Sequence, residues 1–281
     1  MTVRIAHLSD IHFGGEDSIV AQAAIDAVRA FAPDLVVVTG DLTLNGLPEE
    51  FEAAQAWLSR LPEPRLVTPG NHDTPYWNLP MRALVPFGRF RRLIGPSEGG
   101  AFDGPGLSVR CLNSARGAQP RLDWSKGAIN LARLEAVIAQ MARTPESLRV
   151  FACHHPLVEV VGAPVTGGVH RGAVAAAALN HGGVDLILTG HVHNPFAVVL
   201  PYGDHLTYAV GAGTLSLRTR GTPAGLSLLT ADQGCVRVTA LGWAGAGFET
   251  YRTWTLPRRV RPSVPEDSSA IGGTTQAAAV S

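Results

Sequence analysis

The apolar run at residues 34–39 (DLVVVT) is the feature that most limits the fold of this chain. Consecutive β-branched residues without polar alternation are typical of a strand buried on both faces in a parallel sheet. A second apolar run, Val3–Leu8, precedes it, and apolar residues at helical spacing lie between the two, from Val20 to Phe31. Parallel strands joined by helices form α/β sheets with right-handed crossovers. The sequence therefore predicts an α/β fold.

The same alternation continues along the chain. Further strands are expected at residues 65–68, 107–112, 148–153 and 184–189, and further helices at 48–61 and 131–141. After residue 194, short runs separated by turn signals indicate a largely antiparallel portion, with strands at 196–200, 205–210, 225–230, 235–241 and 248–255. Two segments break the pattern: residues 74–106 are expected to form a cap-like insertion, and residues 157–172 a Gly-rich loop.

Length and composition indicate a single folded unit with a tail. A chain of 281 residues, 46% hydrophobic and 16% charged, supports a large core and excludes global disorder. We expect one domain over residues 1–260. Residues 261–281 are aperiodic and rich in small residues and Pro, so they are predicted to be a disordered tail.

Charge and targeting signals point away from nucleic acid and membranes. Lys and Arg together number 23, as do Asp and Glu, so no basic footprint for duplex nucleic acid or an anionic membrane is expected. No apolar run approaches the roughly 18 residues of a membrane span, and no export signal is expected at the N-terminus. Three scattered cysteines suit a reducing compartment, so a cytoplasmic location is expected. A homo-oligomeric assembly is left open.

Metal-type side chains follow the carboxyl ends of the expected strands. They are Asp10 and His12 in SDIH, Asp41 in TGDL, Asn71, His72 and Asp73 in GNHD, His154 and His155 in CHHP, and His191 and His193 in GHVH. Ligands of open α/β sheets bind at this edge. In an extended segment, residues two apart point the same way, so Asp10 and His12 are expected to reach one ion, as are His191 and His193.

The donor set predicts the kind of ion. Nitrogen and oxygen donors without a thiolate suit Mn, Fe or Zn and exclude a cysteine-type structural zinc site. Seven or more candidate ligands exceed one tetrahedral site, which indicates two ions that share a carboxylate. The other histidines, His7, His170, His181 and His205, are expected to be structural or surface residues.

In this order, SDIH, GD, GNHD, HHP and GHVH resemble the calcineurin-like metallophosphoesterases, over roughly residues 3–240. The HLSDIHF opening is most similar to their bacterial class III cyclic-nucleotide phosphodiesterase branch. The resemblance implies a four-layer αββα sandwich with two mixed β-sheets and a dinuclear metal site at the C-terminal ends of the strands.

The resemblance also implies roles for individual residues. It places Asp10, His12, Asp41 and His193 around one ion, and Asp41, Asn71, His154 and His191 around the other, with Asp41 as the bridge. Asn71 and His72 would face the substrate, with His72 as the catalytic residue, whereas His155 is not expected to bind metal. Phosphoprotein phosphatases of the family read GDxxDRG, but this chain has Leu44 at the second Asp position. This departure argues against a protein phosphatase and leaves the partner of His72 open, with Asp73 as one candidate.

The function implied is hydrolysis of small phosphodiesters, with cyclic nucleotides as one candidate substrate. A hydroxide held between two metal ions would attack the phosphorus, and His72 would bind a phosphoryl oxygen or protonate the leaving group. A diester carries one negative charge, so an apolar pocket with few arginines is expected to suffice. The alternatives are a phosphomonoesterase using the same centre and a non-catalytic binding module of the same fold.

Two further features of the segment 74–106 concern its aromatic residues and a GxSxG pattern. The aromatic residues Tyr76, Trp77, Phe87 and Phe90 would either pack on the leaving group or fill a core. The pattern GxSxG at residues 95–99 lacks the flanking strand and helix of a nucleophile elbow and is interpreted as a loop.

Overall fold

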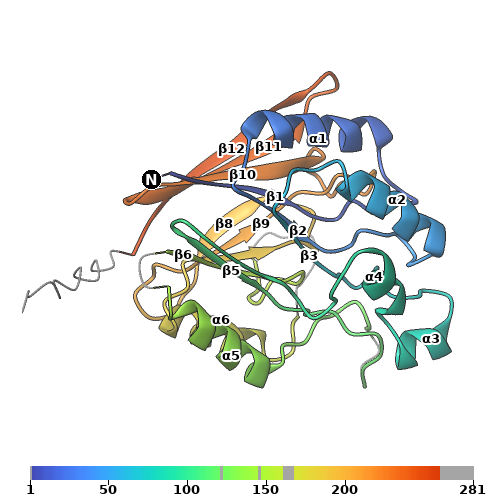
Figure 1. Cartoon of the computed structure of the whole chain (residues 1–281), viewed down its shortest axis with the longest axis horizontal. Coiled ribbons are helices and arrows are strands. Elements are labelled where there is room, and N and C mark those ends of the chain that lie inside the picture. The colour runs from blue at the N-terminus through green and yellow to red at the C-terminus, as the bar shows by residue number, and fades with distance from the viewer. Residues whose placement is uncertain (1, 121–122, 145–146, 161–167, 260–281) are drawn as a thin grey trace, which may run out of the picture.

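Two six-stranded sheets form the centre of the computed structural model, which describes residues 2–120, 123–144, 147–160 and 168–259 (Figure 1). The first sheet has the strand order β12-β11-β10-β1-β2-β3 and the second β4-β5-β6-β7-β9-β8. The first contains β1 (Val3–Leu8), β2 (Leu35–Thr39), β3 (Arg65–Thr68), β10 (Gly225–Ala231), β11 (Cys235–Trp243) and β12 (Phe248–Pro257). The second contains β4 (Ala101–Gly104), β5 (Leu107–Cys111), β6 (Leu148–Ala152), β7 (Leu186–Thr189), β8 (Phe196–Val199) and β9 (Tyr208–Gly211).

Both sheets are mixed. In the first, β1, β2 and β3 are parallel while β10, β11 and β12 are antiparallel; in the second, β5, β6, β7 and β9 are parallel and the two edge strands are antiparallel. The helices are α1 (Ser18–Phe31), α2 (Pro48–Leu58), α3 (Leu79–Leu84), α4 (Gly88–Leu93), α5 (Leu131–Met141) and α6 (Gly172–His181).

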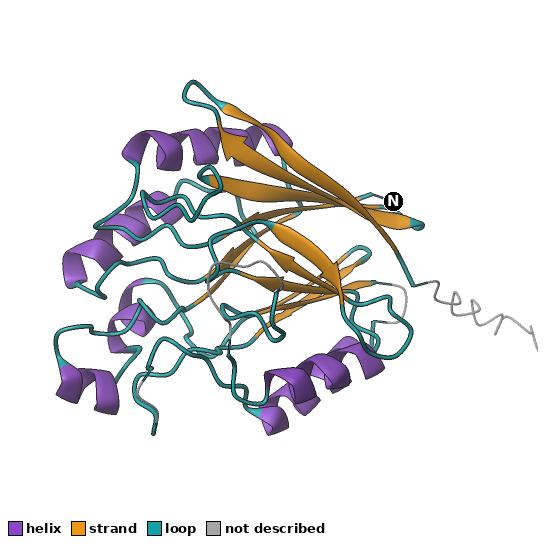
Figure 2. Ribbon diagram, turned by 180° about the vertical axis from the view of Figure 1, so that it is seen from behind, coloured by secondary structure: helices purple, strands orange, loops and turns teal. Residues whose placement is uncertain are grey.

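Three apolar cores separate four layers. Along β2, Val36 and Val38 face the core beneath α1 and α2, whereas Leu35 and Val37 face the core between the two sheets. A third core lies between the second sheet and helices α5 and α6. Figure 2 shows the helices on the outer faces of the two stacked sheets. This arrangement confirms the expected αββα sandwich with two mixed sheets, and it explains why the strands are apolar on both faces.

Outside residues 74–106, the sequence interpretation differs from the structure in two places. Helix α6 was not expected, because its Ala-rich sequence has no polar face from which helical periodicity could be recognised. Strand β9 pairs in parallel with β7, so the portion after residue 194 is not wholly antiparallel. Short strands in isolation carry no information on the direction of their partners.

Residues 74–106 combine exposed and buried parts. Phe87 and Phe90 are buried in the core under α2, and β4 forms an edge of the second sheet, so these parts belong to the body of the sandwich. Tyr76 and Trp77 are exposed. Residues 95–99 form a loop after α4, in agreement with the interpretation of the GxSxG pattern. Whether the exposed part acts as a cap stays a prediction.

The remaining expectations concern the termini, the cysteines and membranes. The expected tail lies outside the described residues, and the domain boundary at residue 260 stays a prediction. Cys111, Cys153 and Cys235 are all unpaired. Among the described helices, none combines the length and the apolar character that crossing a membrane requires.

Truncation of a buried and of an exposed aromatic residue within residues 74–106 should have different effects on stability. Phe90 is fully buried and meets Phe51 edge to face, so Phe90→Ala should lower the free energy of unfolding by about 3–5 kcal/mol. Trp77 is 76% exposed, so Trp77→Ala should change that free energy by no more than about 0.5 kcal/mol. Urea denaturation measures both. Equal effects of the two substitutions would contradict this division of the segment.

Candidate metal centre

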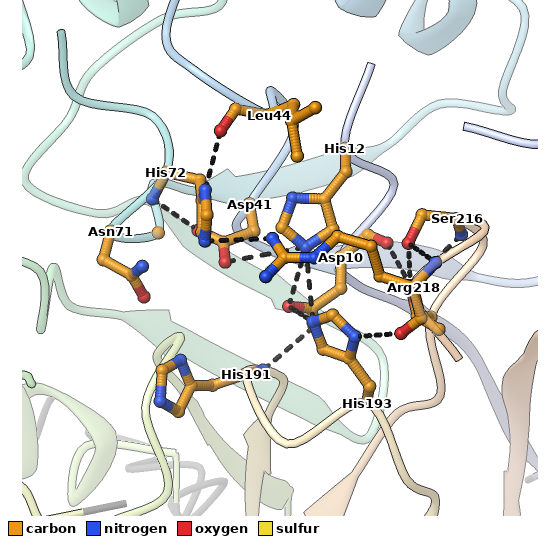
Figure 3. A network of polar contacts seen from close by, with 12 residues as sticks. Asp10, His12, Asp41, Leu44, Asn71, His72, His191, His193, Ser216 and Arg218 are labelled. Atoms are coloured by element: carbon orange, nitrogen blue, oxygen red, sulfur yellow. Dashed lines mark hydrogen bonds and ion pairs between the residues drawn. The ribbon is translucent and has the colours of Figure 1, made fainter. Parts of the chain in front are cut away.

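The expected ligand residues meet at one edge of the sandwich. They follow the carboxyl ends of β1, β2 and β3 in the first sheet and of β6 and β7 in the second. Figure 3 labels all of the proposed ligands except His154. Hydrogen bonds join the segments where they leave the sheets: Asp10 N donates to Gly40 O at 3.0 Å, and Gly190 N donates to His154 O at 2.9 Å. A Cβ atom on Gly190 would lie 1.8 Å from Ser9 Oγ, so only glycine permits this approach of the two sheets.

Most of the candidate ligands have a left-handed backbone, which the sequence did not predict. Five of the seven have φ between 52° and 68°: Asp10, His12, Asp41, His191 and His193. Asp10 and His12 do lie in one group of potential ligands, but through left-handed turns and not through an extended strand. His191 and His193 lie in different groups, so the expectation that both reach one ion is wrong. Such conformations cost roughly 1–2 kcal/mol per residue and concentrate at functional sites.

One group of side chains consists of Asp10, His12 and His193. The Nε2 atoms of His12 and His193 lie 3.2 Å apart, and His193 Nε2 lies 3.1 Å from Asp10 Oδ1. The second carboxylate oxygen of Asp10 accepts a hydrogen bond from the His191 peptide N–H at 2.9 Å. Asp10 therefore has one oxygen fixed by the backbone and one turned toward the two imidazoles.

A second group surrounds Asp41. Its Oδ2 lies 3.3 Å from His154 Nε2 and 3.9 Å from His12 Nε2, so this carboxylate faces both groups. The ring of His191 packs edge to face on that of His154. Asp41 Oδ1 accepts a hydrogen bond from the His72 peptide N–H at 2.8 Å. Asp41 thus lies between the two groups, as a shared ligand would.

Backbone carbonyls orient three of the imidazole rings. His12 Nδ1 lies 3.3 Å from Thr43 O, His154 Nδ1 lies 2.6 Å from Thr39 O, and His193 Nδ1 lies 2.7 Å from Arg218 O. A carbonyl oxygen only accepts, so each Nδ1 carries a proton, and each ring, when neutral, presents an Nε2 lone pair to the centre. Histidine ligands of metal sites are commonly fixed in this way.

The electrostatics of the centre favour a cation. Burial raises the pKa of Asp10 and Asp41, but the neighbouring imidazoles outweigh it and hold both pKa values below their usual range. Burial lowers the pKa of His12 and of His191 to about 3, so both rings are neutral at pH 7. Burial opposes charge on His154 as well, yet the Asp41 carboxylate raises its pKa to about 9. In the polypeptide alone, a proton on His154 therefore offsets part of the negative charge of the two carboxylates.

The donor atoms themselves fit metal ions. Asp10 Oδ1, Asn71 Oδ1 and His154 Nε2 are buried and have no hydrogen-bond partner. With Nδ1 protonated, the Nε2 atoms of His12 and His193 and Asp10 Oδ1 are three acceptors that face one another within 3.8 Å. Acceptors at such distances repel one another unless a cation lies between them. The arrangement fits a dinuclear centre of nitrogen and oxygen donors.

His72 faces the cleft from the edge of this centre. Its Nδ1 donates to Leu44 O at 2.7 Å, and its Nε2 lies 3.3 Å from an Nη atom of Arg218 (Figure 3). The partner left open by the sequence is therefore a backbone carbonyl at the very position where phosphoprotein phosphatases have a carboxylate. Asp73 is not that partner: it accepts hydrogen bonds from Thr43 and from Gly70 N, and thereby holds the GNHD turn in place.

A cleft of about 300 Å³ opens over the centre, and its rim is charged. Besides Asp41, Asn71, His72, His191 and His193, it is lined by Asp123, Ser125, Lys126, Arg218 and Arg220. The cleft is therefore not the apolar pocket with few arginines that would suffice for a simple diester. The alternating arginines in SLRTR lie in a turn-rich stretch between expected strands, and their spacing was the one signal that could have revealed them.

The remaining histidines differ in their surroundings. His155 lies beside His154 and His191, but its Nδ1 contacts Ser114 Oγ and its Nε2 contacts Ser125 O, both at 2.8 Å. Both of its nitrogens are thus engaged, which supports its exclusion from the ligand set. His7 is buried, with its Nε2 3.0 Å from Thr39 Oγ1.

Solved structures share this fold at low sequence identity. A dimetal phosphatase from Danio rerio superposes with a TM-score of 0.64 and 10% identity, covering 92% of this chain and 99% of its own. A purple acid phosphatase from yellow lupin (Lupinus luteus) seeds gives a TM-score of 0.66 and 15% identity, covering 95% of this chain and 57% of its own. Similarity at this level shows the fold alone.

Sequence comparison identifies curated relatives. A 3′,5′-cyclic-nucleotide phosphodiesterase of Nostoc sp. is 25% identical over 70% of this chain and 73% of its own length. A probable cyclic nucleotide phosphodiesterase of Synechococcus sp. is 26% identical over 70% and 75%. A glycerophosphodiester phosphodiesterase of Enterobacter lignolyticus is 37% identical over 25% of this chain and 29% of its own length.

The resemblance to the cyclic-nucleotide phosphodiesterases noted in the sequence is thereby confirmed. The profile of the calcineurin-like phosphoesterases matches residues 3–195, which contain every candidate ligand. The chain belongs to the calcineurin-like phosphoesterases, a family of enzymes with a dinuclear metal centre.

Proposed function

We propose that this protein is a metal-dependent phosphodiesterase that hydrolyses small phosphodiesters, with cyclic nucleotides as one candidate class. The observation that carries the proposal is the pair of buried carboxylates, Asp10 and Asp41, set among imidazoles whose lone pairs face them. The names of the relatives support the choice of diesters, since all three describe phosphodiesterases. The cleft above the carboxylates is large enough for a small substrate.

Each proposed ion has its own ligands and shares Asp41. Asp10, His12, Asp41 and His193 would hold one ion, and Asp41, Asn71, His154 and His191 the other. The donor types suit Mn, Fe or Zn. When bound, two such ions activate water as a nucleophile and neutralise charge on the phosphoryl oxygens.

His72 is proposed to act on the substrate through one defined atom. Because the Leu44 carbonyl accepts a hydrogen bond from Nδ1, that nitrogen keeps its proton in both charge states of the ring. Any proton that His72 gains or releases is therefore exchanged at Nε2, the atom that faces the cleft. Nε2 can protonate the leaving alkoxide or, as N–H, bind a phosphoryl oxygen. Asn71, on the same turn, would contact the substrate beside it.

A panel of substrates tests the proposed function. The protein, stripped with a chelator and reloaded with Mn²⁺, would be assayed on cyclic nucleotides, glycerophosphodiesters, bis(p-nitrophenyl) phosphate and the corresponding monoesters. We expect diester hydrolysis that disappears with the metal, returns on reloading and exceeds monoester hydrolysis in kcat/KM. A higher kcat/KM on monoesters throughout the panel would replace the proposal with a phosphomonoesterase.

Removing the shared carboxylate should weaken both ions together. Metal at 100 times its Kd stabilises a protein by about 2.7 kcal/mol, so Mn²⁺ should raise the Tm of the native protein by roughly 5–10 °C. Asp41→Ala should abolish most of this shift and reduce Mn content toward zero, while the metal-free variant stays folded. Asp26→Ala, an exposed carboxylate of α1, is the control. An Asp41→Ala variant that retained two ions would contradict the bridging assignment.

Removing the imidazole of His72 should leave the metals in place. His72→Ala should keep its Mn content and lose activity by roughly 10²–10⁴-fold if Nε2 protonates the leaving group. The loss should be larger for alkyl than for p-nitrophenyl esters, because a good leaving group needs no proton. Steady-state kinetics on both ester types, with exposed His181→Ala as the control, measure the difference. Equal losses on both would remove the acid role and leave phosphate binding.

A further inference from the structure

A loop that joins the two sheets passes over the candidate centre. Residues 212–224 connect β9 of the second sheet to β10 of the first, and within them Arg218 and Arg220 line the cleft. In Figure 3 the Arg218 side chain extends across the centre toward His72. Neither arginine belongs to one of the five ligand-bearing motifs, and neither is a candidate ligand.

Hydrogen bonds hold this loop in a fixed conformation. Thr214 Oγ1 donates to Asp10 O at 2.6 Å, Arg218 N donates to Ser216 Oγ at 3.2 Å, and Arg218 O accepts the proton of His193 Nδ1 at 2.7 Å. The loop that orients one candidate ligand therefore also presents the arginines. Side chains mounted on a braced loop bind a ligand at a lower entropic cost than freely moving ones.

Among the described residues, no carboxylate forms an ion pair with the cations around the cleft. In the described part of the chain, no acidic group lies within 4.0 Å of the charged nitrogens of Lys126, Arg218 or Arg220. Arg220 Nη1 is buried and makes no hydrogen bond. Elsewhere in the fold, by contrast, Arg110 is paired with Asp103 and Arg259 with Asp204. Buried unpaired donors are rare and point to a missing partner.

The charges around the cleft indicate which kind of group would pair with Arg220. The carboxylates that act on Arg220 are those of Asp10 and Asp41, and both belong to the proposed ligand set. If the ions engage these two groups, the rim retains three cationic side chains and one carboxylate, that of Asp123. The single charge of a simple diester is already met by the ions. The excess positive charge therefore suits a substrate with further negative charge.

We propose that Arg218 and Arg220, with Lys126 on the same rim, form a subsite for a second phosphate group of the substrate. The subsite deepens the proposed function and rests on it: the substrate is a phosphodiester that carries a phosphate monoester elsewhere in the molecule. The guanidinium groups of Arg218 and Arg220 suit a phosphate monoester, which has several oxygens that accept hydrogen bonds. Each guanidinium can donate two parallel hydrogen bonds to them.

Two matched pairs of substrates test the subsite on the Mn-loaded protein. One is thymidine 5′-(p-nitrophenyl phosphate) with and without a 3′-phosphate, and the other is glycerophosphoinositol with and without a 4-phosphate. Within each pair the scissile diester is the same, and the pairs place the second phosphate at different distances from it. We expect the phosphorylated member of at least one pair to have a kcat/KM at least about tenfold higher.

Variants test whether the arginines cause the preference for the phosphorylated substrate. Arg218→Met and Arg220→Met should each reduce the ratio within the preferred pair at least about fivefold, whereas Arg220→Lys should retain part of it. Arg92→Met removes one exposed charge outside the cleft and should leave the ratio unchanged. Mn content and Tm, measured on every variant, identify any that fails to fold. A ratio near one in both native pairs, or a ratio that the arginine variants do not alter, would overturn the subsite.

A binding measurement separates this proposal from the function on which it rests. Calorimetry would compare thymidine 3′,5′-bisphosphate with thymidine 5′-phosphate as ligands of the native protein and of Arg220→Met. Tighter binding of the bisphosphate that is lost in the variant supports the subsite even if no diester is hydrolysed. Hydrolysis of both members of each pair at equal rates, with equal binding of the two nucleotides, would leave the phosphodiesterase intact and remove the subsite.

Discussion

Two buried carboxylates in close proximity set the main constraint on this structure. Burying charge is costly unless opposite charge or hydrogen bonds compensate it, and Asp10 and Asp41 are both buried. Their compensation comes from both sheets: the carboxylates follow strands of the first, whereas His154, His191 and His193 follow strands of the second. The electrostatic balance of the centre therefore depends on the sheets being packed face to face, and the apolar core between them serves the site as well as the fold.

The segments that leave the strands carry the strain of this arrangement. Five candidate ligands adopt left-handed backbone conformations, which non-glycine residues seldom do, and hydrogen bonds between neighbouring segments hold them there. The loop at residues 212–224 completes the arrangement, because one of its carbonyls fixes His193 and its arginines face the cleft. Orientation of a ligand and recognition of the substrate thus share one structural element, so a change in that loop affects both.

The sequence was most informative about elements whose bounds are set by their own residues. The strands at residues 3–8 and 65–68 and the helix at 131–141 have the predicted bounds, because short apolar runs and the period of an amphipathic helix are both local signals. The ligand residues could be grouped because parallel strands bring their carboxyl ends to one edge. Helix α6, the left-handed turns and the carbonyl of Leu44 could not be predicted. The first lacks a polar face, and the others depend on backbone atoms or on contacts between segments far apart in the chain.

The location of the metal ions tests this account most directly. Crystals of the Mn-loaded protein, measured near the Mn absorption edge, would show each ion as an anomalous difference peak. We expect two peaks, one among Asp10, His12, Asp41 and His193 and the other among Asp41, Asn71, His154 and His191, with the Asp41 carboxylate bound to both. A single peak, or two peaks of which one has no contact with Asp41, would contradict the dinuclear centre built on a shared carboxylate.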